Sequence, residues 1–228
     1  MCGRYNMITD AHVLIDLFAI DRLLVDPALL VGRYNIAPGQ DVPIIRDTEQ
    51  GRTLSMARWG LVPHWSKQAK LKYSTINARA ETVAEKPAYR DAFRHKRCLI
   101  PATGFYEWKQ VGEHKIPYHI YLPDMQVFAF AGLWDHWERE GEGEGEGFDS
   151  CSIIVTGANS LVKSIHDRMP VILDPSFYKV WLNTAHEHRA QLQSVLVPYA
   201  GKLTTEPVSR RVNNPGNDDP RCLDAPAG

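Results

Sequence analysis

The start of the sequence, Met1-Cys2-Gly3-Arg4, offers an unusual pair of reactive groups. The side chain of Cys2 is small, so we expect Met1 to be removed and the mature chain to begin with cysteine. That residue would carry an α-amine and a thiol on neighbouring carbons, with ordinary pKa values of about 8 and about 8.5. An amine can form a Schiff base with a carbonyl, and a thiol can attack one. Together the two groups can close a five-membered thiazolidine ring on an aldehyde, although a lone cysteine is a weak signal by itself.

A carboxyl group among aromatic residues is the second candidate. Glu107 lies in the stretch 104–109, and strand alternation would put it on one face with Phe105, and Tyr106 and Trp108 on the other. An apolar setting raises the pKa of a carboxyl group, which suits a general acid or base near neutral pH. The alternative is an edge-strand glutamate in a salt bridge, and this stretch alone favours neither interpretation.

The stretch 77–81 places three polar side chains at alternate positions. In an extended chain Asn77, Arg79 and Glu81 would share one face, where an amide and a guanidinium could address the same ligand. Taken by itself, the stretch fits a surface strand with mixed polar residues better.

A histidine and an arginine follow one another closely in the stretch 164–170. Histidine is the side chain whose ordinary pKa lies near neutral pH, so His166 could shuttle a proton, while Arg168 could contact a phosphate. The alternative is a structural or merely exposed histidine. No grouping of His, Cys, Asp and Glu has metal-ligand spacing, so we expect no metal.

Composition excludes several classes of protein. The net charge of −1 over 228 residues gives no overall field toward nucleic acid or acidic membranes, so such binding must come from local arginines. The four cysteines are far apart and contain no C-x-x-C pair, which argues against a disulfide framework and fits a reducing compartment. With no signal peptide and no apolar run long enough for a membrane span, we expect a soluble, cytoplasmic protein that does not bind membranes.

Hydrophobic periodicity and turn residues predict the elements that carry these stretches. Helices are expected at 10–19, 88–95, 175–183 and 191–196 with a helical turn at 160–164, and strands at 42–46, 53–59, 97–102, 105–109, 118–122, 127–134, 152–156 and 170–173. Strands interrupted by irregularly placed helices indicate an α+β domain with a curved, barrel-like, largely antiparallel sheet surrounded by helices.

Two segments are expected to lack regular structure. Alternating Glu and Gly make residues 138–147 a flexible, solvated acidic loop without function. The tail over 214–228 is rich in Asn, Pro and Asp and is expected to be extended. No linker or repeat is evident, so residues 1–228 are predicted to form a single domain.

The candidate stretches, taken together and in order, resemble the SRAP family (SOS response-associated peptidase; abasic-site processing proteins). The motifs that carry the resemblance are Met1-Cys2-Gly3-Arg4-Tyr5, Gly32-Arg33-Tyr34-Asn35-Ile36-Ala37-Pro38, Trp59-Gly60-Leu61-Val62-Pro63, Asn77-Ala78-Arg79-Ala80-Glu81-Thr82, Cys98-Leu99-Ile100-Pro101, Gly104-Phe105-Tyr106-Glu107-Trp108, His166-Asp167-Arg168-Met169-Pro170 and Val208-Ser209. They extend from residue 2 to about residue 213.

The resemblance implies a catalytic set for this chain. Members of the SRAP family bind single-stranded DNA and react with abasic sites, whose open form carries an aldehyde. Cys2 would be the nucleophile that forms a thiazolidine crosslink, and Asn77 would orient the Cys2 amine or the sugar. Glu107 would act as general acid and base, and His166 would pass a proton to the deoxyribose oxygen. The family name further implies peptidase activity, most simply self-removal of Met1.

The resemblance also implies DNA contacts and a cellular setting. Arg4, Arg79 and Arg168 would bind the DNA, the last two at phosphates that flank the lesion, and Pro38 and Trp65 would wedge against or stack on bases. Many members carry a second aromatic residue after the position of Trp65, where this chain has Ser66. We expect no cofactor, a monomer, and a cytoplasmic protein that acts in the SOS response at the nucleoid or replication fork.

Two rival hypotheses remain open. An amino-terminal-nucleophile hydrolase or cysteine peptidase would use Cys2 with His166 and Glu107 or Asn77, in the order nucleophile, base and orienting group. A non-catalytic reader of single-stranded or modified DNA would need the arginines and Trp65 but not Cys2.

Overall fold

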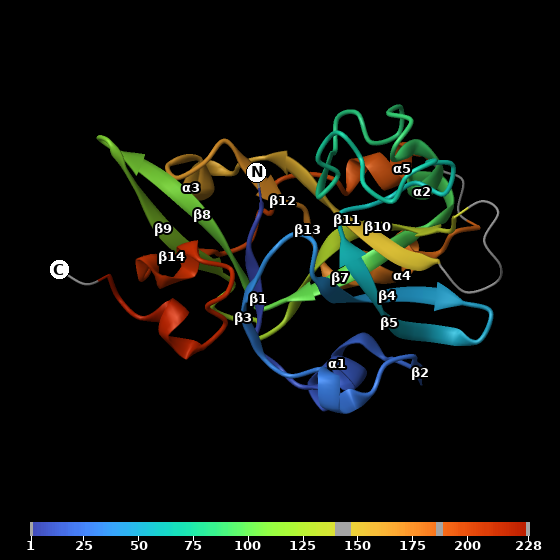
Figure 1. Ribbon diagram of the computed structural model, residues 1–228, viewed down its shortest axis with the longest axis horizontal. Helices are drawn as coiled ribbons and strands as arrows, with labels where there is room; N and C mark the ends of the chain where they lie inside the picture. The colour runs from blue at the N-terminus through green and yellow to red at the C-terminus, as the bar shows by residue number, and fades with distance from the viewer. Residues whose placement is uncertain (1, 140–146, 186–188, 227–228) are drawn as a thin grey trace.

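The computed structural model describes residues 2–139, 147–185 and 189–226, and the strands in this part of the chain form two sheets (Figure 1). The smaller sheet has the order β14 (Thr204–Pro207), β9 (His114–Tyr121), β8 (Gly104–Val111), β1 (Tyr5–Met7) and β3 (Arg33–Ile36). The larger has the order β12 (Arg168–Pro170), β11 (Phe148–Gly157), β10 (Phe128–Trp137), β7 (Arg97–Ala102), β4 (Asp41–Thr48), β5 (Gly51–Trp59) and β2 (Arg22–Leu23), with β13 (Ile172–Leu173) beside β10 and β6 (Asn77–Arg79) beside β11.

The larger sheet closes on itself. Strand β11 pairs antiparallel with β10 on one side and in parallel with β5 on the other, so that β11, β10, β7, β4 and β5 form a ring. The residues packed in its core are aliphatic or aromatic and fully buried, among them Ile44, Leu54, Leu99, Phe130 and Ile153. Most strand pairs are antiparallel, which confirms the predicted α+β class and its curved sheet.

Short helices connect and cover the strands. Helix α1 (Ala11–Phe18) begins where the Asp10 side chain accepts from the backbone N–H groups of His12 and Val13, and it buries Leu14 and Phe18. The others are α2 (Arg90–His95), α3 (Ser160–Lys163), α4 (Tyr178–Leu182) and α5 (Arg189–Ser194), with 3₁₀ turns η1 (Pro27–Leu29), η2 (Pro175–Phe177), η3 (Arg210–Asn213) and η4 (Pro220–Leu223). No helix in the described ranges is long and apolar enough to cross a membrane.

The β8–β9 hairpin projects from the ring at the left of Figure 1. Its first strand presents two different faces, as alternation predicted. Phe105 belongs to the main core and Glu107 is buried, whereas Tyr106 and Trp108 pack in a separate cluster with residues near the carboxyl terminus. The face that carries Glu107 therefore turns away from that second cluster.

The tail over 214–228 was expected to be extended, but its described residues contain the 3₁₀ turn η4 and form hydrogen bonds with β3. Residues 208–224, here called the C-terminal segment, contain η3 and η4 and dock onto β3. The Asn35 amide donates to the carbonyls of Val212, Asn214 and Asn217, at 3.2, 3.0 and 2.7 Å. Asp218 accepts from the backbone N–H groups of Tyr34 and Asn35, so the polar residues that suggested a solvated tail instead bind the backbone and side chains of β3.

The other segment expected to be irregular is the acidic loop 138–147. Residues 140–146 lie outside the described residues, so the expectation for that loop stays a prediction.

Candidate active site

Cys2 lies in the interior of the protein, immediately before β1. Its side chain has no solvent exposure, and its carbonyl oxygen accepts a hydrogen bond of 2.8 Å from the Asn77 side-chain amide. Burial raises the pKa of the Cys2 thiol far above its ordinary value, and the nearby charge of Glu107 raises it further. The thiol is therefore protonated at neutral pH, and the two catalytic candidates Cys2 and Glu107 interact electrostatically.

Asn77 is held by its backbone as well as by its side chain. Strand β6 pairs in parallel with β11, which sets Asn77 opposite Ile153, and the Tyr89 hydroxyl donates to the Asn77 carbonyl at 3.0 Å. The Asn77 side-chain oxygen Oδ1 is buried and accepts no hydrogen bond from any described residue. An unsatisfied buried acceptor next to a nucleophile is a ready partner for a ligand N–H or O–H group.

Glu107 is a buried acid, which is one of the two interpretations that its aromatic neighbours left open. Its side chain lies on β8 and is 3% exposed, and burial raises its pKa to about 7. A carboxyl group that titrates near neutrality can both donate and accept a proton under physiological conditions.

His166 precedes β12 and is partly buried. Its Nδ1 atom lies 3.0 Å from the backbone nitrogen of Arg168, from which it can accept, and 3.3 Å from the Arg168 carbonyl oxygen, to which it can donate. Burial lowers the pKa of His166, so the neutral form predominates near pH 7. In the tautomer in which Nδ1 accepts from Arg168, the neutral ring carries its proton on Nε2.

A cavity of about 370 Å³ joins the acid and the histidine. It is lined by Glu107, Trp108, Lys115 and His166, which come from β8, β9 and the loop before β12. Cys2 and Asn77 are linked by a hydrogen bond, Cys2 and Glu107 by their electrostatic interaction, and Glu107 and His166 by this cavity. The structure therefore brings all four predicted catalytic residues together.

The three predicted DNA-binding arginines differ in their surroundings. Arg4 donates from Nη1 to Asn35 Oδ1 at 2.9 Å and to the Val212 carbonyl at 2.7 Å, and its guanidinium lies over Trp108. Arg168 forms an ion pair with Glu81. Arg79 is exposed on β6, next to Asn77 in the alternating pattern that the sequence predicted.

The two predicted base contacts are both at the surface. Pro38 is exposed at a turn in which Gly39 has a positive φ of 86°, and Trp65 is 48% exposed. The residue before Trp65 is anchored, because Asp135 accepts from the backbone N–H and from Nδ1 of His64, at 2.8 and 3.0 Å. An aromatic ring held outward by a fixed backbone is suited to stacking.

Three residues near the site had no distinguishing signal in the sequence. Lys115 is an ordinary hairpin lysine by its local pattern, Tyr89 lies 12 residues from Asn77, and Asp135 lies 71 residues from His64. Each matters through a contact that only the tertiary fold creates.

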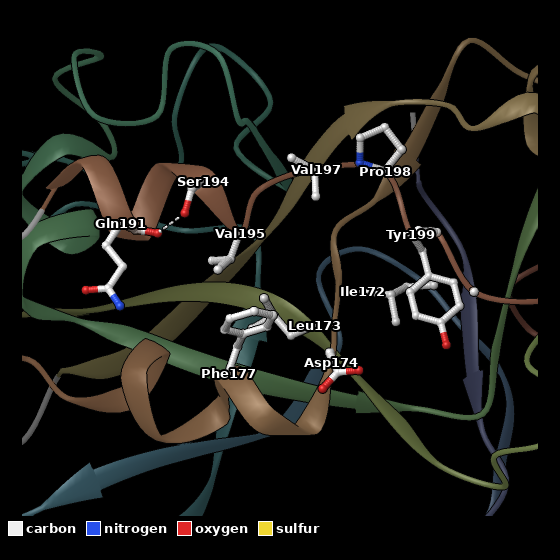
Figure 2. A pocket seen from close by; sticks show the side chains of 12 residues that line it. Ile172, Leu173, Asp174, Phe177, Gln191, Ser194, Val195, Val197, Pro198 and Tyr199 are labelled. Carbon is white, nitrogen blue, oxygen red and sulfur yellow. Dashed lines mark hydrogen bonds between the residues drawn. The ribbon is translucent and has the colours of Figure 1, made fainter.

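A second cavity, of about 470 Å³, contains none of the predicted site residues. Figure 2 shows the side chains of Phe177, Leu173 and Val195 gathered on one side, and Tyr199 with Ile172 on the other. Its lining is mainly apolar. No group of three or more metal-ligating side chains occurs within the described ranges.

Comparison with known proteins gives a consistent result. Residues 1–215 match the family described as SOS response associated peptidase (SRAP). The chain is 41% identical to the abasic site processing protein YoqW of Bacillus subtilis (strain 168), over 99% of this chain and 100% of that one. It is 32% identical to the abasic site processing protein YedK of Escherichia coli (strain K12), over 95% and 96% of the two chains.

A solved structure supports the same relationship. The crystal structure of a protein from Bacteroides thetaiotaomicron superposes with a TM-score of 0.88 at 29% identity, and covers 98% of this chain and 99% of that chain. Fold, motifs and sequence similarity therefore agree that the chain belongs to the SOS response associated peptidase (SRAP) family.

Proposed function

We propose that this protein processes abasic sites, by capturing the ring-opened aldehyde of an abasic site in single-stranded DNA as a covalent thiazolidine with Cys2. The observation that carries the proposal is the buried Cys2, held by the Asn77 amide at 2.8 Å and next to a carboxyl group whose pKa is about 7. The names of the relatives, which are abasic site processing proteins, support the choice of lesion.

The chemistry needs only the two groups of an amino-terminal cysteine. After Met1 is removed, the Cys2 amine adds to the aldehyde carbon, and loss of one water gives an imine. The thiol sulfur then adds to the imine carbon while its proton moves to the nitrogen. Aldehyde, amine and thiol thus become a thiazolidine and one water, with no redox step.

The pKa values favour attack by the amine first. The buried Cys2 thiol stays protonated at neutral pH, so it is a weak nucleophile until a base takes its proton. Glu107 in its carboxylate form is that base in our proposal, and in its acid form it protonates the departing hydroxyl of the carbinolamine. The Nε2–H group of His166 would donate to the deoxyribose ring oxygen and so open the sugar to its aldehyde.

The remaining site residues would hold the strand. Asn77 would orient the amine or the sugar through its unsatisfied Oδ1, and Arg79 and Arg168 would bind flanking phosphates. Arg168 would exchange its ion pair with Glu81 for the phosphate. Arg4 would present its outer edge to the DNA, and Pro38 and Trp65 would contact bases beside the lesion.

A cysteine peptidase acting on other proteins fits the site less well. Such enzymes need a thiolate beside an imidazolium, whereas burial raises the pKa of the Cys2 thiol and lowers that of His166. We limit the proposed peptidase activity to removal of Met1 by the protein itself, which mass spectrometry of purified wild-type and Glu107→Gln protein would test.

The decisive experiment is a denaturing gel shift. Mature wild-type protein, verified by mass spectrometry to begin at Cys2, and the Cys2→Ala variant are each incubated with single-stranded DNA that contains one abasic site or none. A band that survives denaturation should form only with the wild type and only with the lesion. No such band from verified wild-type protein would refute covalent capture, and an equal band from Cys2→Ala would refute the role of the thiol.

A further inference from the structure

Lys115 lines the cavity that contains Glu107 and His166, although it belongs to no motif of the family resemblance. It lies near the tip of the β8–β9 hairpin, where it pairs with Gln110. The other lining residues supply an acid, an aromatic ring and a proton carrier. A lysine adds a positive charge to a cavity that would receive a phosphodiester-linked sugar.

The Lys115 ammonium has no competing partner among the described residues, with which it forms neither a hydrogen bond nor an ion pair. By contrast, Arg168 is paired with Glu81, and Arg4 donates to Asn35 and to the Val212 carbonyl. An uncommitted cation at the edge of a cavity needs no rearrangement before it can bind an anion. Its charge also contributes to the lowered pKa of His166, after the larger effect of burial, which means that the two residues interact across the cavity.

We propose that Lys115 binds a phosphate of the abasic nucleotide itself while the sugar of that nucleotide occupies the cavity beside Glu107 and His166. This inference rests on the proposed function. An abasic nucleotide lacks the base that would otherwise orient it, so contacts to its own phosphate have a larger share in its positioning. The flexible stem and three donors of lysine suit a phosphate whose position shifts as the sugar opens.

The test uses noncovalent binding, so that it does not depend on crosslinking. Lys115→Gln and the control Lys109→Gln are made in the Cys2→Ala background, and affinity for the abasic oligonucleotide is measured by fluorescence anisotropy over a range of salt concentrations. Lys109 lies opposite Ile116 on the same hairpin and does not line the cavity. One lost phosphate contact should reduce the slope of log affinity against log salt by about 0.7.

We expect Lys115→Gln to weaken binding about fivefold at moderate salt, Lys115→Arg to restore most of the affinity, and Lys109→Gln to bind like its parent. Thermal unfolding should be the same for all variants, because the Lys115 side chain has no described bonding partner. An unchanged salt slope in Lys115→Gln would refute the phosphate contact, even if the pH dependence of crosslinking changed through His166.

Failure of the two proposals can be distinguished. If wild-type protein forms the crosslink while Lys115→Gln keeps both the parental slope and the parental affinity, the role of Lys115 is refuted and covalent capture stands. If wild-type protein forms no crosslink but Lys115→Gln shows a smaller slope of log affinity against log salt and a lower affinity, Lys115 is a phosphate contact and the crosslinking mechanism is refuted.

Discussion

The two cavities described above differ in the side chains that line them and in how burial of those side chains affects the stability of the fold. The larger one, lined by Leu173, Phe177 and Tyr199 among others, is formed by side chains that gain stability when they leave water. The smaller one is lined by Glu107 and His166. Burial of a charged Glu107 lowers the stability of the folded protein, and burial lowers the pKa of His166. In this protein the candidate reactive site is therefore identified by titratable groups that lie close together, and not by the volume or the apolar lining of a cavity.

Glu107→Gln should have the largest effect on chemistry. Glutamine keeps the shape of the side chain but can neither take the thiol proton nor donate one, so the crosslinking rate should fall by about 10²- to 10⁴-fold. Single-turnover crosslinking to an abasic oligonucleotide measures this rate. The control is Glu113→Gln, an exposed acid at the turn of the same hairpin, which should react like the wild type. An equal loss in both variants would mean that any charge change on the hairpin impairs the reaction.

Leu173→Ala, in the apolar cavity, should lower stability but leave the crosslinking rate unchanged. Leu173 is 2% exposed on β13, and truncation of a buried leucine costs about 2–5 kcal/mol of unfolding free energy. Chemical denaturation should show this loss, while the crosslinking rate per folded molecule stays unchanged. Val197→Ala, at a residue that is 52% exposed in the same cavity, should cost much less. A crosslinking defect in Leu173→Ala at full folding would link the two cavities functionally.

The raised pKa of Glu107 predicts how stability depends on pH. The unfolded carboxyl group releases its proton near its ordinary pKa of 4.5, whereas the folded one keeps it until about pH 7. Between these values the unfolded state binds fewer protons, so Glu107 lowers stability progressively as pH rises through this window, by on the order of 3 kcal/mol.

Glu107→Gln should therefore be more stable than the wild type above pH 7 and equally stable below pH 4.5. Urea unfolding of the two proteins across this range tests the sign. A stability difference that does not change with pH would contradict burial as the origin of the shift.

Tyr89→Phe should have the smallest effect of the four. It removes the hydroxyl that donates to the Asn77 carbonyl at 3.0 Å, and loss of one neutral hydrogen bond to a positioning element should slow crosslinking by about threefold. Tyr199→Phe is the matched change in the apolar cavity and should leave the rate unchanged. If Tyr199→Phe reacted more slowly than the wild type, or Tyr89→Phe reacted at the wild-type rate, the assignment of catalysis to the Glu107 cavity and of stability to the apolar cavity would be contradicted.

Local patterns predicted a large part of this molecule. Helix α1 lies within the helix predicted at 10–19, and strands β4 and β5 contain the strands predicted at 42–46 and 53–59. The aromatic residues next to Glu107 indicated a buried acid as one of two interpretations, and the structure shows Glu107 buried. These features depend on interactions between residues close in sequence, which is why the sequence alone could indicate them.

The features that the sequence could not indicate depend on distant partners. The parallel pairing of β6 with β11, which places Asn77, joins residues more than 70 positions apart. The division into two sheets and the position of Lys115 at the cavity follow from such pairings. The C-terminal segment was misjudged because its Asn and Asp residues suit turns in solvent, yet the Asp218 side chain and the Asn217 carbonyl find hydrogen-bond partners on β3.

The docking of the C-terminal segment has a consequence for the order in which the site is completed during synthesis. Arg4, two residues after Cys2, is fixed by the carbonyl of Val212, which lies 208 residues later in the chain. A ribosome therefore exposes Cys2 long before Val212, Asn214 and Asn217 are made. A growing chain that lacks the C-terminal segment also lacks the carbonyl groups that hold Arg4 and Asn35. The hydrogen bonds that fix Arg4 beside Cys2 can therefore form only after the C-terminal segment has been made.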